Sequence, residues 1–125
     1  MNKLKLNLWG REFDLDITYD CYSGETILET QRAAVKALAK MTEELDSSFD
    51  DIKAYCLSQN KEEIGGDVIE NIFKYVIPKY LFVPRSENKE IISIMCNYKF
   101  DPESGIAIVF ENKKLKEIGK QDIIL

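Results

Sequence analysis

Three carboxylates near the end of the chain have a spacing that could support chemistry. Asp101 and Glu103 stand two positions apart, and Asp122 follows in the last segment. A hard cation such as calcium takes roughly six to eight oxygen ligands, so these side chains could form a divalent-metal site or the centre of a metal-dependent hydrolase. The structural interpretation is favoured, because Pro102 and Gly105 beside Asp101 have the composition of a tight turn.

A second acidic set, in the N-terminal half, could bind a protein partner. Residues 12–51 hold eleven acidic and three basic side chains, whereas residues 1–11 hold three basic side chains and none that is acidic. A surface of one charge accelerates encounter with an oppositely charged protein, although a solvated face is the more common meaning of such a run. The residues expected to bind a basic partner are Asp14, Asp16, Glu43, Glu44 and Asp46.

The absence of histidine narrows the chemistry further. Without histidine the chain has no Ser-His-Asp or Cys-His catalysis of its own and no histidine-ligated zinc. Its three cysteines, Cys21, Cys56 and Cys96, are widely spaced, which indicates reduced thiols in the core. We therefore expect a protein that is not an enzyme, with no catalytic residues, no bound metal and no cofactor.

Length and composition predict one globular domain over residues 1–125. The chain is 45% hydrophobic and 31% charged, with a net charge of -5. This acidic balance disfavours nucleic acid as a partner, since phosphate binding needs clustered lysine and arginine. No apolar run approaches about eighteen residues and the first residues alternate, so we expect a cytoplasmic location and no membrane contact.

Alternating apolar residues predict a hairpin at the start of the chain. A two-residue turn at Gly10-Arg11 would place Leu6 opposite Leu15, with apolar side chains facing each other at every pair. Trp9 is expected to close the end of the sheet, and an anchor at a protein interface is the alternative.

Helical periodicity then predicts three helices. The first runs from a capping box at Thr26 to a stop at Asp46-Ser47-Ser48, and a shorter one follows from Ser48. The third opens at Asp67 and ends at Ile77, because the proline that follows disfavours helical geometry there.

The end of the chain predicts a second hairpin and a further strand. The tight turn after Phe100 would place Tyr98 opposite Ile108. A second turn at Asn112-Lys113 would place Phe110 opposite Leu115. Together with the first hairpin, this predicts an α+β fold, in which a mainly antiparallel sheet carries about three helices packed on one face.

The segment DPESGIAIVF, followed by EIGKQDIIL, resembles the C-terminal signature of a family of small bacterial domains of unknown function. In that signature D-x-E-x-G opens a strand and G-x-x-D follows, with a weaker echo at Gln31 of this chain. The matching positions are Asp101, Glu103, Gly105, Gly119 and Asp122. Family members often have histidine where this chain has Ser104, and Asn-Gly where it has Asn112-Lys113. The resemblance implies a bacterial origin, a small α+β fold and an association with toxin immunity loci, but no reaction.

These observations favour a non-enzymatic interaction protein that binds a protein partner through its acidic half, with an immunity protein as one version. The alternative is a carboxylate-based metal-binding protein or hydrolase around Asp101 and Glu103. A structural subunit of a homo-oligomer is the third hypothesis, since an exposed apolar patch would support a two-fold interface.

Overall fold

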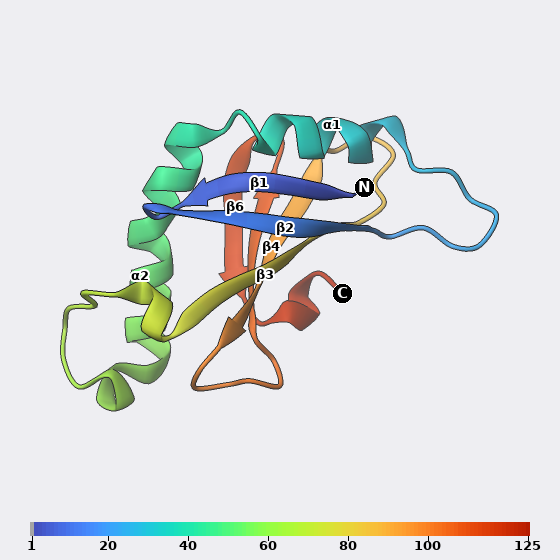
Figure 1. Ribbon diagram of the computed structural model, residues 1–125. Coiled ribbons are helices and arrows are strands. Elements are labelled where there is room, and N and C mark those ends of the chain that lie inside the picture. The colour runs from blue at the N-terminus through green and yellow to red at the C-terminus, as the bar shows by residue number, and fades with distance from the viewer. Residues whose placement is uncertain (1) are drawn as a thin grey trace.

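Six strands and two α-helices make up most of the computed structural model, which describes residues 2–125 (Figure 1). The strands are β1 (Lys3–Leu8), β2 (Arg11–Tyr19), β3 (Val76–Val83), β4 (Ile91–Tyr98), β5 (Ile106–Glu111) and β6 (Lys114–Gly119). The helices are α1 (Glu29–Leu38) and α2 (Thr42–Ile64), with short 3-10 turns η1 (Ile72–Lys74) and η2 (Gln121–Ile123).

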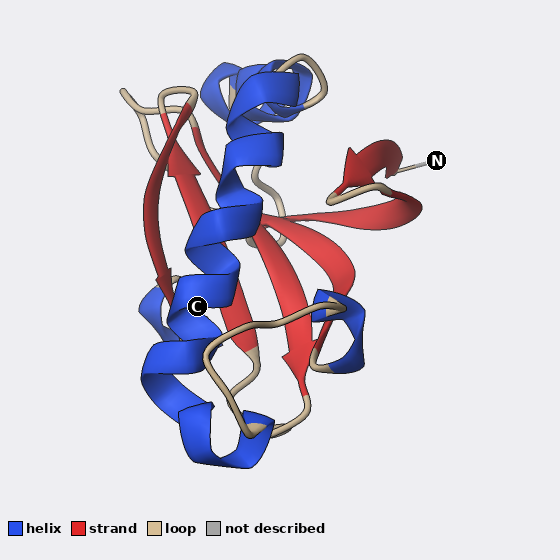
Figure 2. Ribbon diagram, turned by 90° about the vertical axis from the view of Figure 1, so that its left-hand side faces the viewer, coloured by secondary structure: helices blue, strands red, loops and turns tan. Residues whose placement is uncertain are grey.

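The strands form one mixed sheet in which spatial order follows chain order, β1 to β6. Every neighbouring pair is antiparallel except β2 and β3, which run parallel. A parallel pair needs a crossover connection, and α1 and α2 lie within that connection. The sheet twists strongly, so that β1 and β2 run across the direction of β4 to β6 in Figure 1. Figure 2 shows α2 extending along the sheet.

The structure is α+β, but the prediction of about three helices is wrong, because only two α-helices form within residues 2–125. The first break in the helical layer falls at residues 39–41, and α2 continues through the predicted stop. Serine hydroxyls there donate back along the helix, from Ser47 to the Glu44 carbonyl (3.0 Å) and from Ser48 to the Leu45 carbonyl (2.6 Å). These polar side chains are thus satisfied without ending the helix.

The predicted third helix, residues 67–77, is also wrong. That segment is mostly a loop that ends in η1, and β3 begins at Val76 and runs through Pro78. The pairing of β3 with β4 shifts between Pro78 and Tyr80. A proline lacks the N–H that a regular ladder requires, so a strand accommodates it at such an irregularity.

The N-terminal hairpin forms with a different register from the predicted one. Its turn residues are Trp9 and Gly10, with φ of 55° and 86°, and Leu6 pairs with Phe13 instead of Leu15. Two positive φ values characterise the type I′ turn, whose twist suits a hairpin. Because the register differs by an even number of residues, Leu6 and Leu15 still share the buried face.

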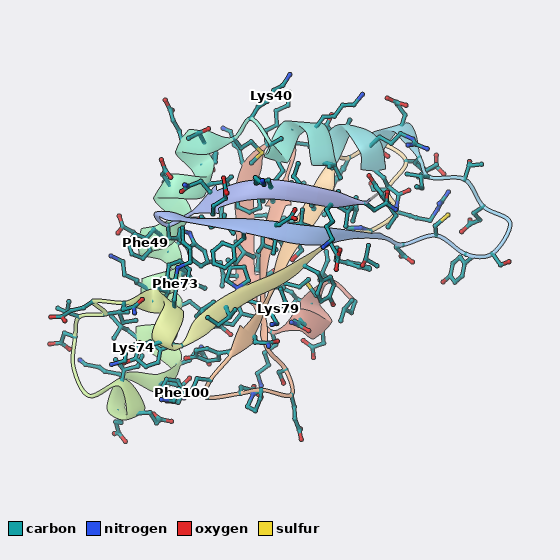
Figure 3. All side chains as sticks on the ribbon, viewed as in Figure 1. Lys40, Phe49, Phe73, Lys74, Lys79 and Phe100 are labelled. Carbon is teal, nitrogen blue, oxygen red and sulfur yellow. The ribbon has the colours of Figure 1, made fainter. Side chains whose placement is uncertain are left out.

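Trp9 holds this turn against the helical layer. Its ring centroid lies 6.4 Å from that of Phe49 on α2 and 5.8 Å from that of Phe73 in η1. Its Nε1–H donates to the Ser48 hydroxyl at 3.0 Å. Figure 3 shows Phe49 and Phe73 beside the end of this hairpin. These contacts stabilise a tryptophan in the left-handed region and position the turn.

The C-terminal hairpin also differs from its predicted register. Ile94, not Tyr98, pairs with Ile108, while Tyr98 pairs with Val76 of β3. Pairing with β3 thus extends β4 past the point where β5 begins, and a longer loop connects β4 and β5. The register differs by four residues, so each side chain keeps its face of the sheet.

The second predicted turn is confirmed. Phe110 pairs with Leu115, and Asn112 and Lys113 are the turn residues between β5 and β6. Their φ values of 50° and 72° are those of a type I′ turn. Local turn chemistry was sufficient here, because the two strands are joined by the shortest common connection.

The main core lies between the helices and one face of the sheet. Fully buried side chains from both layers meet there: Leu38, Ile52, Cys56, Leu81, Ile94, Ile106, Ile108 and Phe110. On the other face a smaller cluster of Met95, Ala107 and Val109 packs against Ile124, beyond η2. Within residues 2–125, no helix has the length and apolar character needed to cross a membrane.

Candidate functional site

The predicted acidic set divides between two elements. Asp14 and Asp16 are exposed on β2, where they alternate with the buried Leu15. Successive strand residues point to opposite faces, so the two aspartates point away from the helical layer. Asp16 lies 3.7 Å from Lys3 Nζ. Glu43, Glu44 and Asp46 instead lie in the first turns of α2. The structure therefore does not gather these five residues into one surface.

Glu44 is hydrogen-bonded to the sheet and is not part of an open acidic surface. Its side chain is half-buried, and Oε2 accepts a hydrogen bond from the Leu115 backbone N–H at 3.3 Å. This donor belongs to β6, which has a neighbour on one side only. Glu44 thus joins α2 to an edge strand. Its negative charge is also favourable near the N-terminus of α2, where the helix dipole is positive.

The remaining acidic residues form an exposed face on α2. Glu43, Asp46 and Asp50 are spaced by three and four residues, which places them on one side of the helix. Asp51 is exposed beside them, and no basic residue occurs in residues 42–51. We call Glu43, Asp46, Asp50 and Asp51 the acidic face.

One residue of the acidic face, Asp51, lines a groove of about 580 Å³ between α2 and β6. Its lining comes from both elements and includes Asp51, Tyr55, Ser58, Leu115, Glu117 and Ile118. Tyr55, Leu115 and Ile118 are half-buried, so they supply apolar surface, while Asp51 and Glu117 are exposed and acidic. Lys116 also borders the groove, but its Nζ lies 3.0 Å from Glu111 Oε1. We call this the α2–β6 groove.

The carboxylates of the signature do not converge. Asp101 Oδ1 accepts from the Ser104 backbone N–H at 3.2 Å, and Lys120 Nζ lies 3.9 Å from Oδ2. Glu103 and Asp122 are exposed. Across residues 2–125, no group of three or more histidine, cysteine, aspartate or glutamate side chains is arranged to hold a metal ion. Asp101 therefore shapes its turn, as the structural interpretation of the sequence expects.

The signature glycines allow the C-terminal segment to close on the β4–β5 loop. Gly105 has a φ of +57°, and a Cβ there would lie 2.6 Å from Gln121 Nε2 and 2.7 Å from the Cys96 carbonyl oxygen. Gln121 Nε2 donates to that carbonyl at 3.0 Å, and its backbone N–H donates to Ser104 O at 3.0 Å. Gly119 similarly lets Ile123 approach, since a Cβ would lie 3.1 Å from Ile123 Cδ1.

Sequence reasoning missed Gln121, which lies at an unspecified position of the G-x-x-D pattern. Its side-chain partner is 25 residues away, so nothing local indicates the contact. Gln31, the weaker echo, has a comparable role. It is buried, and its Nε2 donates to the carbonyls of Asp20 and Val83 at 3.1 Å each, where parallel strands β2 and β3 end.

A small polar pocket of about 160 Å³ lies beside the signature loop. Tyr98 donates to Asn60 Oδ1 at 2.7 Å, and Asn60 departs from helical geometry within α2. Burial, with Cys56 nearby, raises the pKa of Tyr98 well above its usual range. Burial also raises the pKa of Tyr55, and the charges of Cys56 and Asp101 add to that effect. Both phenols therefore stay protonated at neutral pH, and the phenol of Tyr98 acts as a hydrogen-bond donor.

The same burial predicts a loss of stability in alkaline solution. It raises the pKa of Cys56 from 9.0 to about 11 and raises that of Cys96 as well. The unfolded chain loses these protons at lower pH than the folded chain does. The free energy of unfolding should therefore be unaffected below about pH 9 and fall as the pH rises toward about 11.

Urea denaturation midpoints measured below and within this pH window test the expectation. Replacement of Cys56 by alanine should make the decline shallower, because one of the shifted groups is gone. A midpoint that stays constant through the window in the unmodified protein would contradict the assignment.

Comparison with known proteins gives a family and nothing finer. No match was found for the chain among curated proteins or among solved structures. The family model DUF6985, described as a domain of unknown function, matches residues 1–125, and the chain therefore belongs to this family.

Proposed function

We propose that this protein is a non-enzymatic binding module that docks a basic segment of a protein partner in the α2–β6 groove. The observation that carries the proposal is the groove itself, where half-buried apolar side chains lie between exposed acidic ones. Apolar surface supplies affinity, and the acidic rim selects a partner of opposite charge.

The neighbouring elements support this choice of groove. Asp51 of the acidic face lines the groove, so part of the charge that steers the partner lies at the surface that would hold it. The positive charge of Lys116 is offset by Glu111. The signature at residues 101–122 resembles that of a family associated with toxin immunity loci. That resemblance supports a basic bacterial toxin as the partner and an immunity-type role in the cytoplasm.

A charged side chain placed in the groove should block this binding. Ser58 is exposed on α2 and lines the groove, and its hydroxyl donates to the Tyr55 carbonyl at 2.7 Å. Ser58→Arg would fill the groove and repel a basic segment, and we expect the Kd for a partner to rise by roughly tenfold or more. The partner would be sought first among the products of neighbouring reading frames, and its binding measured by calorimetry.

Ser47→Arg is the matched control. Ser47 is an exposed serine of the same helix with the same kind of bond, to the Glu44 carbonyl, but it lies outside the groove. The added charge is the same in both variants, but Ser47→Arg leaves the groove open. Its Kd for the partner should therefore rise less than that of Ser58→Arg. Equal loss in the two variants would show only a charge effect and would overturn the groove as the docking site.

A second pair of variants separates the two halves of the acidic set. Combined Glu43→Gln and Asp46→Asn changes on α2 should slow association at low ionic strength, whereas Asp14→Asn with Asp16→Asn on β2 should not. Loss of binding only in the β2 variant would move the docking surface to the opposite face of the sheet.

A further inference from the structure

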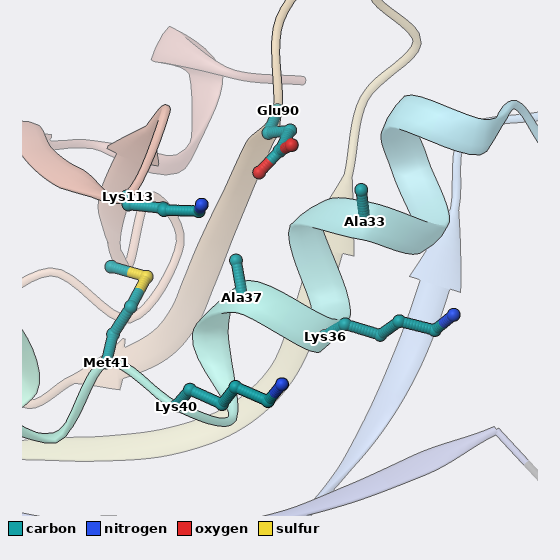
Figure 4. Close-up of a pocket in the computed structure, with 7 residues that line it drawn as sticks. All are labelled: Ala33, Lys36, Ala37, Lys40, Met41, Glu90 and Lys113. Atoms are coloured by element: carbon teal, nitrogen blue, oxygen red, sulfur yellow. The ribbon is translucent and has the colours of Figure 1, made fainter.

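A separate pocket of about 400 Å³ lies between α1 and the start of β4, and it shares no residue with the α2–β6 groove. Its volume falls within the roughly 300–1,000 Å³ that small-molecule sites occupy. Ala33 and Ala37 of α1 and the buried Met41 supply apolar lining. Figure 4 shows the two alanine methyl groups and the Met41 side chain directed toward the side where Glu90 and Lys113 lie.

Glu90 carries the main evidence for a ligand. Its Oε1 is shielded from solvent and has no hydrogen-bond partner within residues 2–125. The backbone of Glu90 is held in place by two hydrogen bonds to Asn112. Glu90 N–H donates to Asn112 Oδ1 at 3.0 Å, and Asn112 N–H donates to Glu90 O at 2.8 Å. A carboxylate that keeps one shielded oxygen without a donor is held unfavourably, so a ligand that donates to this carboxylate would gain correspondingly.

The other charged groups of the pocket are ammonium groups. Lys113 extends from the β5–β6 turn across the space below Glu90 (Figure 4). Its φ of 72° belongs to the type I′ turn, which fixes where its side chain starts. Lys36 and Lys40 of α1 also border the pocket, but their ammonium groups are directed away from Glu90 and Lys113 (Figure 4). One carboxylate and one ammonium group beside apolar surface suit a ligand that carries both charges.

We propose that this pocket binds a small zwitterion of the amino-acid type with an apolar side chain. The ligand's ammonium group donates to the Glu90 carboxylate. Its carboxylate accepts from Lys113, and its side chain packs on Ala33, Ala37 and Met41. Neither charge alone satisfies the site, because an anion leaves Glu90 without a donor and a simple amine gains nothing from Lys113.

A titration followed by amide chemical shifts in two-dimensional NMR tests the proposal. The probes are L-leucine, L-methionine and L-phenylalanine, with 4-methylpentanoate and isopentylamine as leucine analogues that retain only one charge. We expect saturable shifts for at least one amino acid in residues 33–41 and 112–113. The one-charge compounds should bind roughly tenfold more weakly or worse.

Two variants test whether Glu90 binds the ligand's ammonium group and Lys113 binds its carboxylate. Glu90→Gln should weaken the amino acid roughly tenfold or more, because the anionic acceptor is lost. Lys113→Gly removes the ammonium group while giving the turn the Asn-Gly sequence that type I′ geometry favours, so folding is preserved and a similar loss is expected. Lys114→Gln is the matched control, since Lys114 is exposed next to it and does not line the pocket.

Three results would overturn the assignment. These are no saturable shift with any of the three amino acids, equal binding of 4-methylpentanoate or isopentylamine, and unchanged binding in Glu90→Gln.

Discussion

Replacement of Trp9 by alanine is expected to lower the free energy of unfolding by roughly 3–5 kcal/mol, the range for deleting a large buried aromatic side chain. Trp9 is only 8% exposed and contacts both α2 and η1 through Phe49 and Phe73. These segments lie far apart in the chain, so the loss affects the docking of the helical layer on the sheet.

Two further variants show how much of the lost stability comes from the hydrogen bond and how much from burial of the ring. Trp9→Phe retains a ring but loses the hydrogen bond to Ser48, and should cost roughly 1–2 kcal/mol. The loss is smaller because Ser48 keeps its own bond to the Leu45 carbonyl. Tyr22→Ala removes an aromatic side chain that is 75% exposed, and should change stability by no more than about 0.5 kcal/mol.

Unfolding in urea should be followed by circular dichroism, because Trp9 is the only tryptophan and its replacement removes the fluorescence signal. Similar midpoints for Trp9→Ala and Tyr22→Ala would mean that the turn does not hold the helical layer.

Gly105→Ala is the second substitution with a large expected effect, roughly 2–5 kcal/mol of lost stability. One part, about 1–2 kcal/mol, comes from placing a side chain in the left-handed region at φ +57°. The other part, about 1–3 kcal/mol, comes from crowding. A Cβ would lie 2.7 Å from the Cys96 carbonyl oxygen, which belongs to a central strand and has little room to move.

Gly24→Ala separates these two contributions. Gly24 has a φ of +87°, but a Cβ there meets nothing within 4 Å. It should therefore show the conformational cost alone, and the difference between the two urea midpoints measures the crowding at Gly105. Equal losses would show that the close approach of Gln121 and Cys96 does not explain this glycine of the signature.

Local patterns predicted which side chains are buried better than they predicted which strands meet. Alternation placed Leu6 and Leu15 on one face, and both are buried. Their register was wrong because Trp9 enters the turn, and its partners Phe49 and Phe73 lie on α2 and η1. A distant contact thus selected between two hairpins that both satisfy the alternation.

The candidate sites also combine features that the local sequence indicated with features that only the fold decided. The sequence indicated the acidic run, but only the folded chain separates Asp14 and Asp16 from Asp46 and uses Glu44 to hold β6. The α2–β6 groove and the Glu90 pocket were not foreseen, because each combines elements that are far apart in the chain.

The sequence by itself determined the features that neighbouring residues control. These are the α+β class, the alternating faces of the terminal strands and the Asn112-Lys113 turn. Tertiary structure alone decided the number of helices, the registers of the β1–β2 and β4–β5 hairpins and the parallel pairing of β2 with β3. The physical reason is that a period-two pattern is unchanged by an even shift along the strand, so burial against distant elements must select the register.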